Sequence, residues 1–305
     1  MAVHDDRGPS LAEAASWIAR FSGRHVVVKL GGELLEPAVI GRIAPQIAAM
    51  HRVGLKPVVV HGGGAQVDRA CRDRNVAIDK VGGRRITSPE VLELLVDVVA
   101  GDLNERLVDG LKAAGVPAHG FAAGVSRSIR CTQRPASAGS DGVVRDWGRV
   151  GDVEDVDVRA LEEERAAVAV AADPATSQPL GQRWIIPVLP SLGFDDAGWL
   201  NVNADAVARA VAVRLDAAKL VLMTGVRGII HSAGDAGPIS RLSRAQARQL
   251  IDDGVVAGGM RAKVEEALGA LDAGVPRVHI LSGRDPMSLL RELFTDDGCG
   301  TLLLP

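Results

Sequence analysis

Two turns of the chain place consecutive glycines directly after an apolar strand, where the backbone can approach an anion. They are Lys29-Leu-Gly-Gly and His61-Gly-Gly-Gly. Glycine has no Cβ, so the main chain can come close to a bound group and aim its amides at it. Each turn alone could also be an ordinary strand-to-helix connection. His61 is better explained as a structural histidine that bonds a backbone carbonyl than as a general base. Together the turns predict a site for phosphate or carboxylate groups.

Three further segments carry cations or amides at expected helix starts. They are Gly83-Arg-Arg85, Asn201-Val-Asn-Ala-Asp205 and Gly258-Gly-Met-Arg-Ala-Lys263. A guanidinium suits bidentate capture of a carboxylate, although a single arginine is more often a solvated charge. Asparagine before an apolar helix also fits an N-cap. Lysine near a helix start opposes the helix dipole, which a bound polyanion explains better than stability does.

Apolar runs alternate with segments of helical periodicity, and this pattern predicts the elements that position those residues. Strands are expected at 25–30, 57–60, 166–171, 185–189, 219–223 and 277–281. Helices are expected at 10–22 with Ser10 as cap, through residues 40–50, from a Thr87-Ser-Pro-Glu capping box, and after Asn203, Ser243 and Gly259. Residues 131–146 are expected to form an exposed hairpin or loop. The alternation predicts an α/β fold, with a mainly parallel sheet between two layers of helices.

Composition excludes several classes of function. Lys and Arg number 35 against 38 Asp and Glu, so the net charge of −3 provides no field that would attract nucleic acid or an anionic membrane. The longest apolar run is too short to span a bilayer, and the first residues have no signal-peptide core. Three scattered cysteines fit a reducing cytoplasm, with no metal-ligand spacing. We therefore expect a cytoplasmic protein that acts on small molecules.

The order and spacing of the five segments resemble acetylglutamate kinases, of the amino-acid kinase family, from about Phe21 to Leu303. Neither a P-loop nor a dinucleotide-binding glycine fingerprint occurs in the chain. The resemblance implies the three-layer αβα fold of that family. It also implies three parts: an N-terminal helix for oligomerisation over 1–23, a lobe for the acylated amino acid and subunit contacts over 24–194, and a nucleotide lobe over 195–305.

The activity that the resemblance implies is phosphoryl transfer from ATP to the side-chain carboxylate of N-acetyl-L-glutamate, in arginine biosynthesis. Mg²⁺ would be held through the ATP phosphates, with no metal ligands from the protein. The implied catalytic residues are Lys29, Lys263 and Asp205. The implied substrate-binding residues are Gly63, Gly64, Arg85 and Asn201. The implied nucleotide- or phosphate-binding residues are Gly31, Gly32, Thr224, Gly225, Gly228, Val256 and Gly259.

The tail around Glu292 and Gly298 is similar to that of the arginine-inhibited members, which implies arginine binding there. It also implies a hexamer built as a trimer of dimers, with a dimer as the alternative. Thr224-Gly225 and the loop at 120–126 depart from the family pattern, and both concern nucleotide and acyl specificity. Two alternatives therefore stay open: a kinase of carrier-protein-linked aminoadipate or glutamate in lysine biosynthesis, and a non-catalytic arginine-sensing domain.

Overall fold

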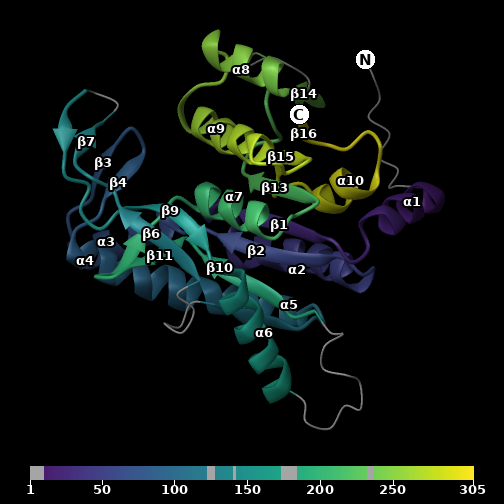
Figure 1. Cartoon of the computed structure of the whole chain (residues 1–305), viewed down its shortest axis with the longest axis horizontal. Coiled ribbons are helices and arrows are strands. Elements are labelled where there is room, and N and C mark those ends of the chain that lie inside the picture. Colours follow the sequence, from purple (N-terminus) through teal and green to yellow (C-terminus); the bar gives the residue numbers. More distant parts are fainter. Residues whose placement is uncertain (1–9, 122–127, 140–141, 173–183, 232–236) are drawn as a thin grey trace.

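The computed structural model describes residues 10–121, 128–139, 142–172, 184–231 and 237–305. At its centre lies an eight-stranded sheet with the order β14-β16-β15-β13-β1-β2-β10-β5 (Figure 1). Neighbouring strands from β15 through to β5 are parallel, whereas β16 runs antiparallel to β15. The bounds are β1 (His25–Leu30), β2 (Lys56–His61), β5 (Ala118–Gly120), β10 (Ile186–Pro190), β13 (Lys219–Thr224), β14 (Arg241–Ser243), β15 (Val278–Ser282) and β16 (Thr301–Leu304).

The side chains of β1 alternate between two hydrophobic cores, one on each face of the sheet. Val26, Val28 and Leu30 belong to the first core, and Val27 belongs to the second. Successive side chains of a strand point to opposite faces, so Lys29 lies on the face of Val27. This alternation decides which helices can offer Lys29 a partner.

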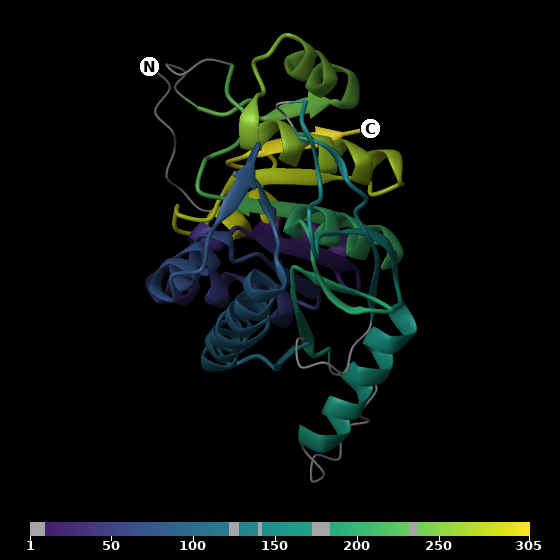
Figure 2. The same ribbon diagram turned by 90° about the vertical axis from the view of Figure 1, so that its left-hand side faces the viewer.

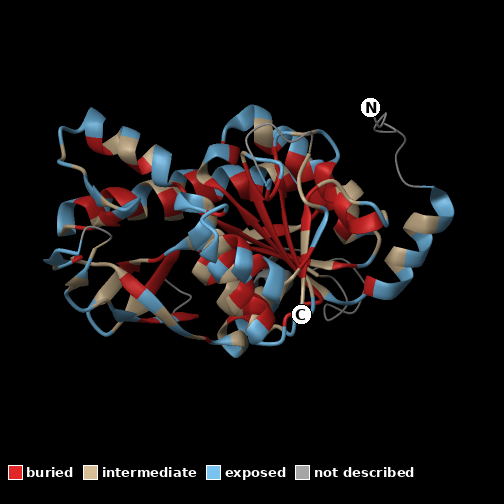
Figure 3. Ribbon diagram, turned by 90° about the horizontal axis from the view of Figure 1, so that it is seen from above, coloured by how far each residue is buried: buried red, intermediate tan, exposed pale blue. Residues whose placement is uncertain are grey.

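Helices cover both faces, which confirms the predicted three-layer αβα fold, and the strands between them are almost entirely buried (Figure 3). The helices whose apolar residues join the first core are α2 (Pro37–Arg52), α3 (Gly64–Asp73), α4 (Pro89–Leu95), the π-helical segment η2 (Val96–Leu103), α5 (Asn104–Ala113) and α10 (Ser288–Phe294). Those that join the second core are α7 (Ala204–Arg214), α8 (Arg244–Asp252) and α9 (Gly258–Asp272).

Smaller sheets lie beside the main one. A four-stranded sheet has the order β12-β11-β6-β9, and two hairpins are formed by β3 with β4 and by β7 with β8. Their bounds are β3 (Asp79–Val81), β4 (Arg84–Ile86), β6 (Ile129–Gln133), β7 (Ser137–Ala138), β8 (Val144–Arg145), β9 (Gly151–Val156), β11 (Leu192–Asp195) and β12 (Gly198–Asn201). The expected hairpin at 131–146 therefore begins inside β6. The predicted lobe boundary, between residues 194 and 195, falls inside β11.

The first helix, α1 (Leu11–Phe21), begins as predicted, because the Ser10 side chain accepts a hydrogen bond from the Glu13 amide. The helix lies beside α10 in Figure 1. Trp17 Nε1 donates to Asp296 Oδ1 at 3.1 Å, and the Asp296 amide donates to Glu13 at 2.6 Å. These bonds attach α1 to the segment that follows α10.

Two local predictions are wrong. Residues 166–171 form no strand but lie in α6 (Val158–Ala172), which projects from the rest of the molecule (Figures 1 and 2). The reason is composition: alanine has the strongest helix propensity, and two valines do not outweigh it. The helix expected from a Thr87 capping box is instead capped by Ser88, with Pro89 in its first turn. Within the described residues, no helix is long and apolar enough to cross a membrane.

Candidate active site

Three neighbouring strands end together at the centre of the sheet. Strand β1 lies between β2 and β13, and their last residues are Leu30, His61 and Thr224. The chain leaves β1 toward β2 on one side, while β13 pairs with β1 on the other. In open parallel sheets, ligands bind beyond the carboxyl ends of strands where the order reverses. The strand order thus creates a binding site between the two glycine turns and the loop after β13.

Two lysines meet one carboxylate at this edge of the sheet. Lys29 Nζ lies 2.8 Å from Asp205 Oδ1, and Lys263 Nζ lies 2.8 Å from Asp205 Oδ2. The Lys263 contact is a hydrogen bond, whereas the Lys29 contact is an ion pair without hydrogen-bond alignment. At most 12% of any of the three side chains is exposed. The structure therefore brings together residues that are 176 and 58 positions apart in the chain, by subtraction of their numbers.

Burial and charge oppose each other in this cluster. Burial acts to raise the pKa of Asp205, but the charges of Lys29 and Lys263 outweigh it and hold that pKa below its ordinary value. The pKa of Lys263 is lowered, first by burial and then by the Lys29 charge, and the Asp205 carboxylate opposes both effects. One carboxylate thus holds two ammonium groups close together, although alone they would repel.

The helices that carry Asp205 and Lys263 are fixed to each other. Asn203 caps α7, because its side chain accepts from the amides of Asp205 and Ala206 at 2.7 and 3.2 Å. One turn further along, Arg209 Nε donates to Glu266 Oε2 of α9 at 2.7 Å. The predicted cap is confirmed, and it fixes the backbone of Asp205 at the start of α7.

The two glycine turns pack backbone against backbone. A Cβ on Gly32 would lie 3.3 Å from the Gly64 nitrogen and 3.4 Å from the Gly63 Cα. Gln66 Nε2 donates to the Gly32 carbonyl at 2.8 Å and ties the turns together, a contact that sequence analysis missed. Gly63 precedes α3 and has no side chain to cap it, so the first amides of that helix are available to an anion.

Gly31 and Gly32, the two glycines of the first turn, differ in whether their amides are free to bind a ligand. The Gly31 amide donates to the Met223 carbonyl at 3.1 Å, so it joins β1 to β13. Among the described residues, the amides of Gly32 and Gly63 donate to no backbone carbonyl. These two are therefore the better candidates for phosphoryl contact, and the role of Gly31 stays a prediction.

Arg85 lies in β4 with only 8% of the residue exposed. Its Nη2 donates to the Gly64 carbonyl at 2.9 Å and lies 2.7 Å from Asp68 Oδ1. Lys80 also contacts Asp68. Arg85 Nη1 is buried and has no hydrogen-bond partner among the described residues. A guanidinium held from one side, with a free donor on the other, can bind a carboxylate.

Asn201 ends β12 and donates from Nδ2 to Thr87 Oγ1, which lies 2.9 Å away at the end of β4. Thr87 is fully buried, and its amide donates to the Trp147 carbonyl at 3.0 Å. Asn201 thus contacts the residue that lies two positions after Arg85 in the same segment. The loop at 120–126, which departs from the family pattern, lies largely outside the described residues.

The residues predicted to contact the nucleotide lie around the end of β13 and the start of α9. The Thr224 hydroxyl and the Gly225 amide donate to Glu33 Oε1 at 3.2 and 2.9 Å. Glu33 was missed, although its position directly after two glycines could have drawn attention to it. Burial acts to raise the pKa of Glu33, but hydrogen bonds from its own amide and that of Gly225 contribute to a net lowering. This carboxylate bridges the first glycine turn and the loop after β13.

The other residues predicted to contact the nucleotide are Gly228, Val256 and Gly259. Gly228 packs against β16, because a Cβ there would lie 2.7 Å from Thr301 Oγ1. The Val256 side chain is 2% exposed and belongs to the second core, whereas Val255 is 40% exposed. Gly259 lies in the first turn of α9, which has no side-chain cap. A ligand at this end would meet the Val255 side chain and the amides of α9.

Glu292 and Gly298 lie away from the lysine cluster. Glu292 Oε2 accepts from the amides of Cys299 and Gly300 at 2.7 and 2.8 Å, and Oε1 lies 2.7 Å from His279 Nδ1. Burial alone would raise the Glu292 pKa, but these hydrogen bonds lower it to about 2. Gly298 has φ +65°, and a Cβ there would lie 2.7 Å from Glu292 Oε2.

A second cation lies near Glu292 at the amino-terminal ends of the strands. Lys219, the first residue of β13, is 3% exposed. Its Nζ lies 5.0 Å from the Trp17 ring centroid and 4.5 Å from that of Phe21. Burial, followed by the charge of Arg277, lowers the pKa of Lys219 to about 7. The sequence contained this signal as a lysine that begins a buried strand.

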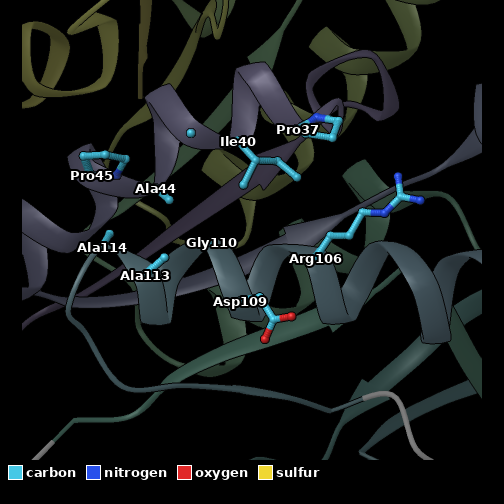
Figure 4. Close-up of a pocket in the computed structure, with 10 residues that line it drawn as sticks. Pro37, Ile40, Ala44, Pro45, Arg106, Asp109, Gly110, Ala113 and Ala114 are labelled. Carbon is cyan, nitrogen blue, oxygen red and sulfur yellow. The ribbon is translucent and has the colours of Figure 1, made fainter.

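Two cavities lie outside the lysine cluster. One of about 430 Å³ lies between α2 and α5 (Figure 4). Its lining is mostly apolar but includes Arg106 and Asp109 of α5, and it contains none of the predicted site residues. The other, of about 790 Å³, is lined by residues of α1, α10 and the tail, including Ile18, Gly298 and Cys299. Among the described residues, no group of three or more His, Cys, Asp or Glu is arranged to hold a metal ion.

Comparison with known proteins agrees with this geometry. Residues 24–282 match the model of the amino acid kinase family. Acetylglutamate kinase from Myxococcus xanthus (strain DK1622) is 35% identical over 311 residues, covering 100% of this chain and 96% of that protein. Acetylglutamate kinase from Symbiobacterium thermophilum is 37% identical over 304 residues, covering 98% of each.

A solved structure extends the comparison to three dimensions. N-acetylglutamate synthase from Neisseria gonorrhoeae, complexed with coenzyme A and N-acetyl-glutamate, superposes with a TM-score of 0.78 at 27% identity. The alignment covers 96% of this chain but only 62% of the synthase chain, so the likeness concerns part of that protein. On the family match and on full-length relatives above 30% identity, this chain belongs to the amino acid kinase family.

Proposed function

We propose that the protein transfers the γ-phosphoryl group of ATP to the side-chain carboxylate of N-acetyl-L-glutamate, forming N-acetyl-L-glutamyl 5-phosphate in arginine biosynthesis. The observation that carries this proposal is the buried Lys29–Asp205–Lys263 cluster at the carboxyl ends of the strands. The acetylglutamate kinases among its relatives, which match over nearly the full length of this chain, support the choice of acceptor. A non-catalytic sensor would have no use for two buried lysines held by one aspartate.

The acceptor chemistry needs no general base, because a carboxylate is already ionised near neutral pH. The protein must hold two anions together and neutralise charge as the phosphoryl group moves. In our proposal, Arg85 binds the α-carboxylate through Nη1, which has no hydrogen-bond partner within the described part of the chain. Asn201, Gly63 and Gly64 hold the acylated amine and the atoms next to it. The surroundings of His61 also argue against a base, since its buried ring is bonded on both nitrogens.

The phosphoryl group would meet the amides of Gly32 and Gly63 from one side and the two ammonium groups from the other. Lys29 and Lys263 then stabilise the charge that develops on the transferred group and on the leaving ADP. Asp205 is a positioning residue that keeps both lysines in place. We propose that Mg²⁺ is held through the ATP phosphates, where it would neutralise part of their charge. The carboxylate of Glu33 is the acidic group beside this region.

We also propose that residues 24–194 bind the acceptor and residues 195–305 bind the nucleotide. Arg85 belongs to the first part, and Thr224, Val255 and the start of α9 belong to the second. The continuous sheet joins these parts directly through the β1–β13 pairing. Lobe movement would therefore be accommodated outside the central strands.

L-arginine is our proposed regulator, bound between α1 and α10. The supporting feature is Lys219, a buried cation with no carboxylate oxygen within 4 Å among the described residues. A ligand carboxylate could pair with it, while the cavity of about 790 Å³ beside Gly298 could take the side chain. We propose a hexamer built as a trimer of dimers, with α1 in its contacts. Sedimentation and arginine titration test this part, and a dimer indifferent to arginine would remove it without affecting the kinase proposal.

An ADP-release assay with ATP and Mg²⁺ tests the main proposal. The acceptors are N-acetyl-L-glutamate, other acylated amino acids and a carrier-protein-linked aminoadipate. We expect turnover with N-acetyl-L-glutamate, and with Lys29→Ala or Lys263→Ala a loss of about 10²–10³-fold in kcat with the fold retained. Turnover restricted to the carrier-linked acceptor would assign the enzyme to lysine biosynthesis. Near-normal kcat in either lysine variant would contradict the mechanism.

A further inference from the structure

A pair of buried polar side chains lies behind the second glycine turn and has no part in the proposed chemistry. His61 is fully buried at the end of β2, and Asn104 is 2% exposed at the start of α5. Asn104 Nδ2 lies 3.1 Å from His61 Nε2 and 3.1 Å from the Val188 carbonyl of β10. His61 Nδ1 lies 3.0 Å from the Gly62 carbonyl. Buried polar groups of this kind persist when each is satisfied, and these are.

The contacts assign every proton in this network. The Val188 carbonyl can only accept, so the atom of Asn104 that faces it must be the NH₂ group and not the oxygen. The second hydrogen of that NH₂ points to His61 Nε2, which must therefore accept. The Gly62 carbonyl also can only accept, so His61 Nδ1 carries the ring proton. His61 is thus neutral with its proton on Nδ1, and both nitrogens are occupied.

The network acts on the turn that the proposed mechanism uses. His61 Nδ1–H holds the carbonyl of Gly62, the first of three consecutive glycines, and glycine loses more conformational freedom on ordering than any other residue. Leu103 and Val99 of η2 also approach Gly63 closely. A Cβ on Gly63 would lie 2.7 Å from the Leu103 side chain and 2.9 Å from that of Val99. π-helical segments often occur at functional sites, and this one ends directly before Asn104.

Asn104 also reaches a third element. A Cβ on Gly120, at the end of β5, would collide with Asn104 Oδ1. The side chain therefore joins the ends of β2 and β5 to β10, close to the start of the loop at 120–126. A residue that merely filled the core could be apolar here, since the interior favours that. An apolar side chain would leave His61 Nε2 without its donor, whereas the Val188 carbonyl would still accept from the Phe121 amide at 3.0 Å.

We infer that Asn104 is a positioning residue: by donating to His61 Nε2 it fixes the His61 tautomer, and His61 in turn fixes the Gly62 carbonyl and the amides that follow it. The inference rests on the proposed use of residues 62–64 by the acceptor and the phosphoryl group. Its structural half, the tautomer, can be tested without substrate.

The protonation of His61 offers a readout that packing alone would not change. Burial lowers the His61 pKa to about 4, opposed only by the hydrogen bond to the Gly62 carbonyl, and no charged side chain of the described residues contributes. His61 therefore stays neutral throughout the working range. In Asn104→Asp the new carboxylate would face Nε2 and raise the His61 pKa, because an opposite charge favours the protonated ring.

The direction of the pH dependence in Asn104→Asp follows from how many N–H donors the His61 ring has. Protonated His61 can donate to both Gly62 and the new carboxylate, which restores the turn. Neutral His61 must place its single proton on Nε2 to meet the carboxylate, which leaves the Gly62 carbonyl without a donor. The variant should therefore resemble the wild type at low pH and lose activity as the pH rises through the raised His61 pKa.

The experiment combines ¹⁵N-histidine NMR with pH profiles of kcat/KM for the acceptor. We expect the Nδ1–H tautomer in the wild type from pH 5.5 to 8.5. In Asn104→Asp we expect a titrating His61 and a kcat/KM about tenfold or more below the wild type at pH 8, the scale of one lost buried hydrogen bond. The ratio should return to within about threefold at pH 5.5. The matched control is Asn75→Asp at an exposed position, which should change neither measurement.

If Asn104→Asp does not fold, Asn104→Leu keeps the branched side-chain shape without a charge or a hydrogen-bond donor. We expect the Nδ1–H tautomer to persist, because the Gly62 carbonyl still accepts from Nδ1. The Nε2 signal should shift because its donor is lost, and kcat/KM should fall. An Nε2–H tautomer in the wild type, or wild-type kinetics and unchanged His61 signals in either folded variant, would overturn the inference. A wild-type enzyme with the Nδ1–H tautomer but no activity toward acylated amino acids would instead count against the proposed function.

Discussion

Replacing Asp205 by asparagine removes the single anion that holds two buried ammonium groups. The substitution preserves shape and one acceptor oxygen, so it tests charge and not packing. Each ion pair spans 2.8 Å, and at an effective dielectric constant near 20 each attraction amounts to about 6 kcal/mol before desolvation is subtracted. Removing one partner of a buried pair typically costs about 3–5 kcal/mol, because the remaining charge is left uncompensated.

The effect on activity should be larger than a loss of stability alone would produce. Without Asp205, the lysines repel each other, and the pKa of Lys263, already lowered by burial and by Lys29, falls further. We expect kcat to fall about 10²–10³-fold, the scale of one misplaced charge at a transition state. The alkaline limb of the pH–rate profile should also move to lower pH, because the Lys263 ammonium group loses its proton earlier once the Asp205 charge is gone.

Urea denaturation and ADP release, measured on the same preparations, separate the two effects. Asp216→Asn is the matched control: Asp216 forms an ion pair of 3.5 Å with Arg24, its side chain is 91% exposed, and such pairs contribute about 0–1 kcal/mol. Asparagine also tolerates the positive φ of 46° at that position. If Asp205→Asn kept kcat within about threefold of the wild type, the proposed role of the cluster would be refuted.

Three other perturbations test separate parts of the structure. Arg85→Lys keeps a charge but loses the planar fork, so the acceptor KM should rise about 10–100-fold with the ATP KM unchanged, and an unchanged acceptor KM would contradict the assignment. Lys219→Met should raise the free energy of unfolding at pH 7, since a lysine with a folded pKa of about 7 destabilises below its unfolded value of 10.5. That penalty diminishes as the pH rises between these values, so the two proteins should converge toward pH 10, and parallel urea curves at pH 7 and 10 would refute this. Glu292 has a folded pKa of about 2, so it contributes about 3 kcal/mol above pH 4.5, lost as the pH falls toward 2. Glu292→Gln should lack this acid-dependent part in denaturation at pH 7 and pH 3, and an identical pH dependence would show that the carboxylate is not stabilised as described.

Local patterns were sufficient wherever one segment decides its own structure. The predicted strands other than 166–171 occur within a residue or two of the expected positions, because buried parallel strands are continuous apolar runs. The caps Ser10, Asn203 and Ser243 were also predictable, since a cap needs only its own helix start. The errors at 166–171 and at Thr87 arose where composition or a one-residue shift left two local structures close in energy.

The candidate site was predictable in its parts but not in its contacts. The motifs suggested that Lys29, Asp205 and Lys263 act together, whereas the pairing of both lysines with the two oxygens of one carboxylate depends on where α7 and α9 cross the sheet. Glu33, Gln66 and Asn104 were missed for the same reason. Their partners lie 191, 34 and 43 positions away in the chain, and no local pattern identifies such pairs.

The sequence by itself determined the chemistry that this chain can attempt. Two lysines, one aspartate and two glycine turns at strand ends define a site for phosphoryl groups, because lysines and glycine amides bind anions in any fold and an aspartate can hold lysines in place. The tertiary structure decided which charges are paired and which donors are free. It uses the Gly31 amide to join β1 to β13 and holds His61 in one tautomer through Asn104. Among the residues that the structure describes, it also leaves Arg85 Nη1 without a hydrogen-bond partner. Burial makes each of these choices costly to reverse, and burial is a property that only the folded chain has.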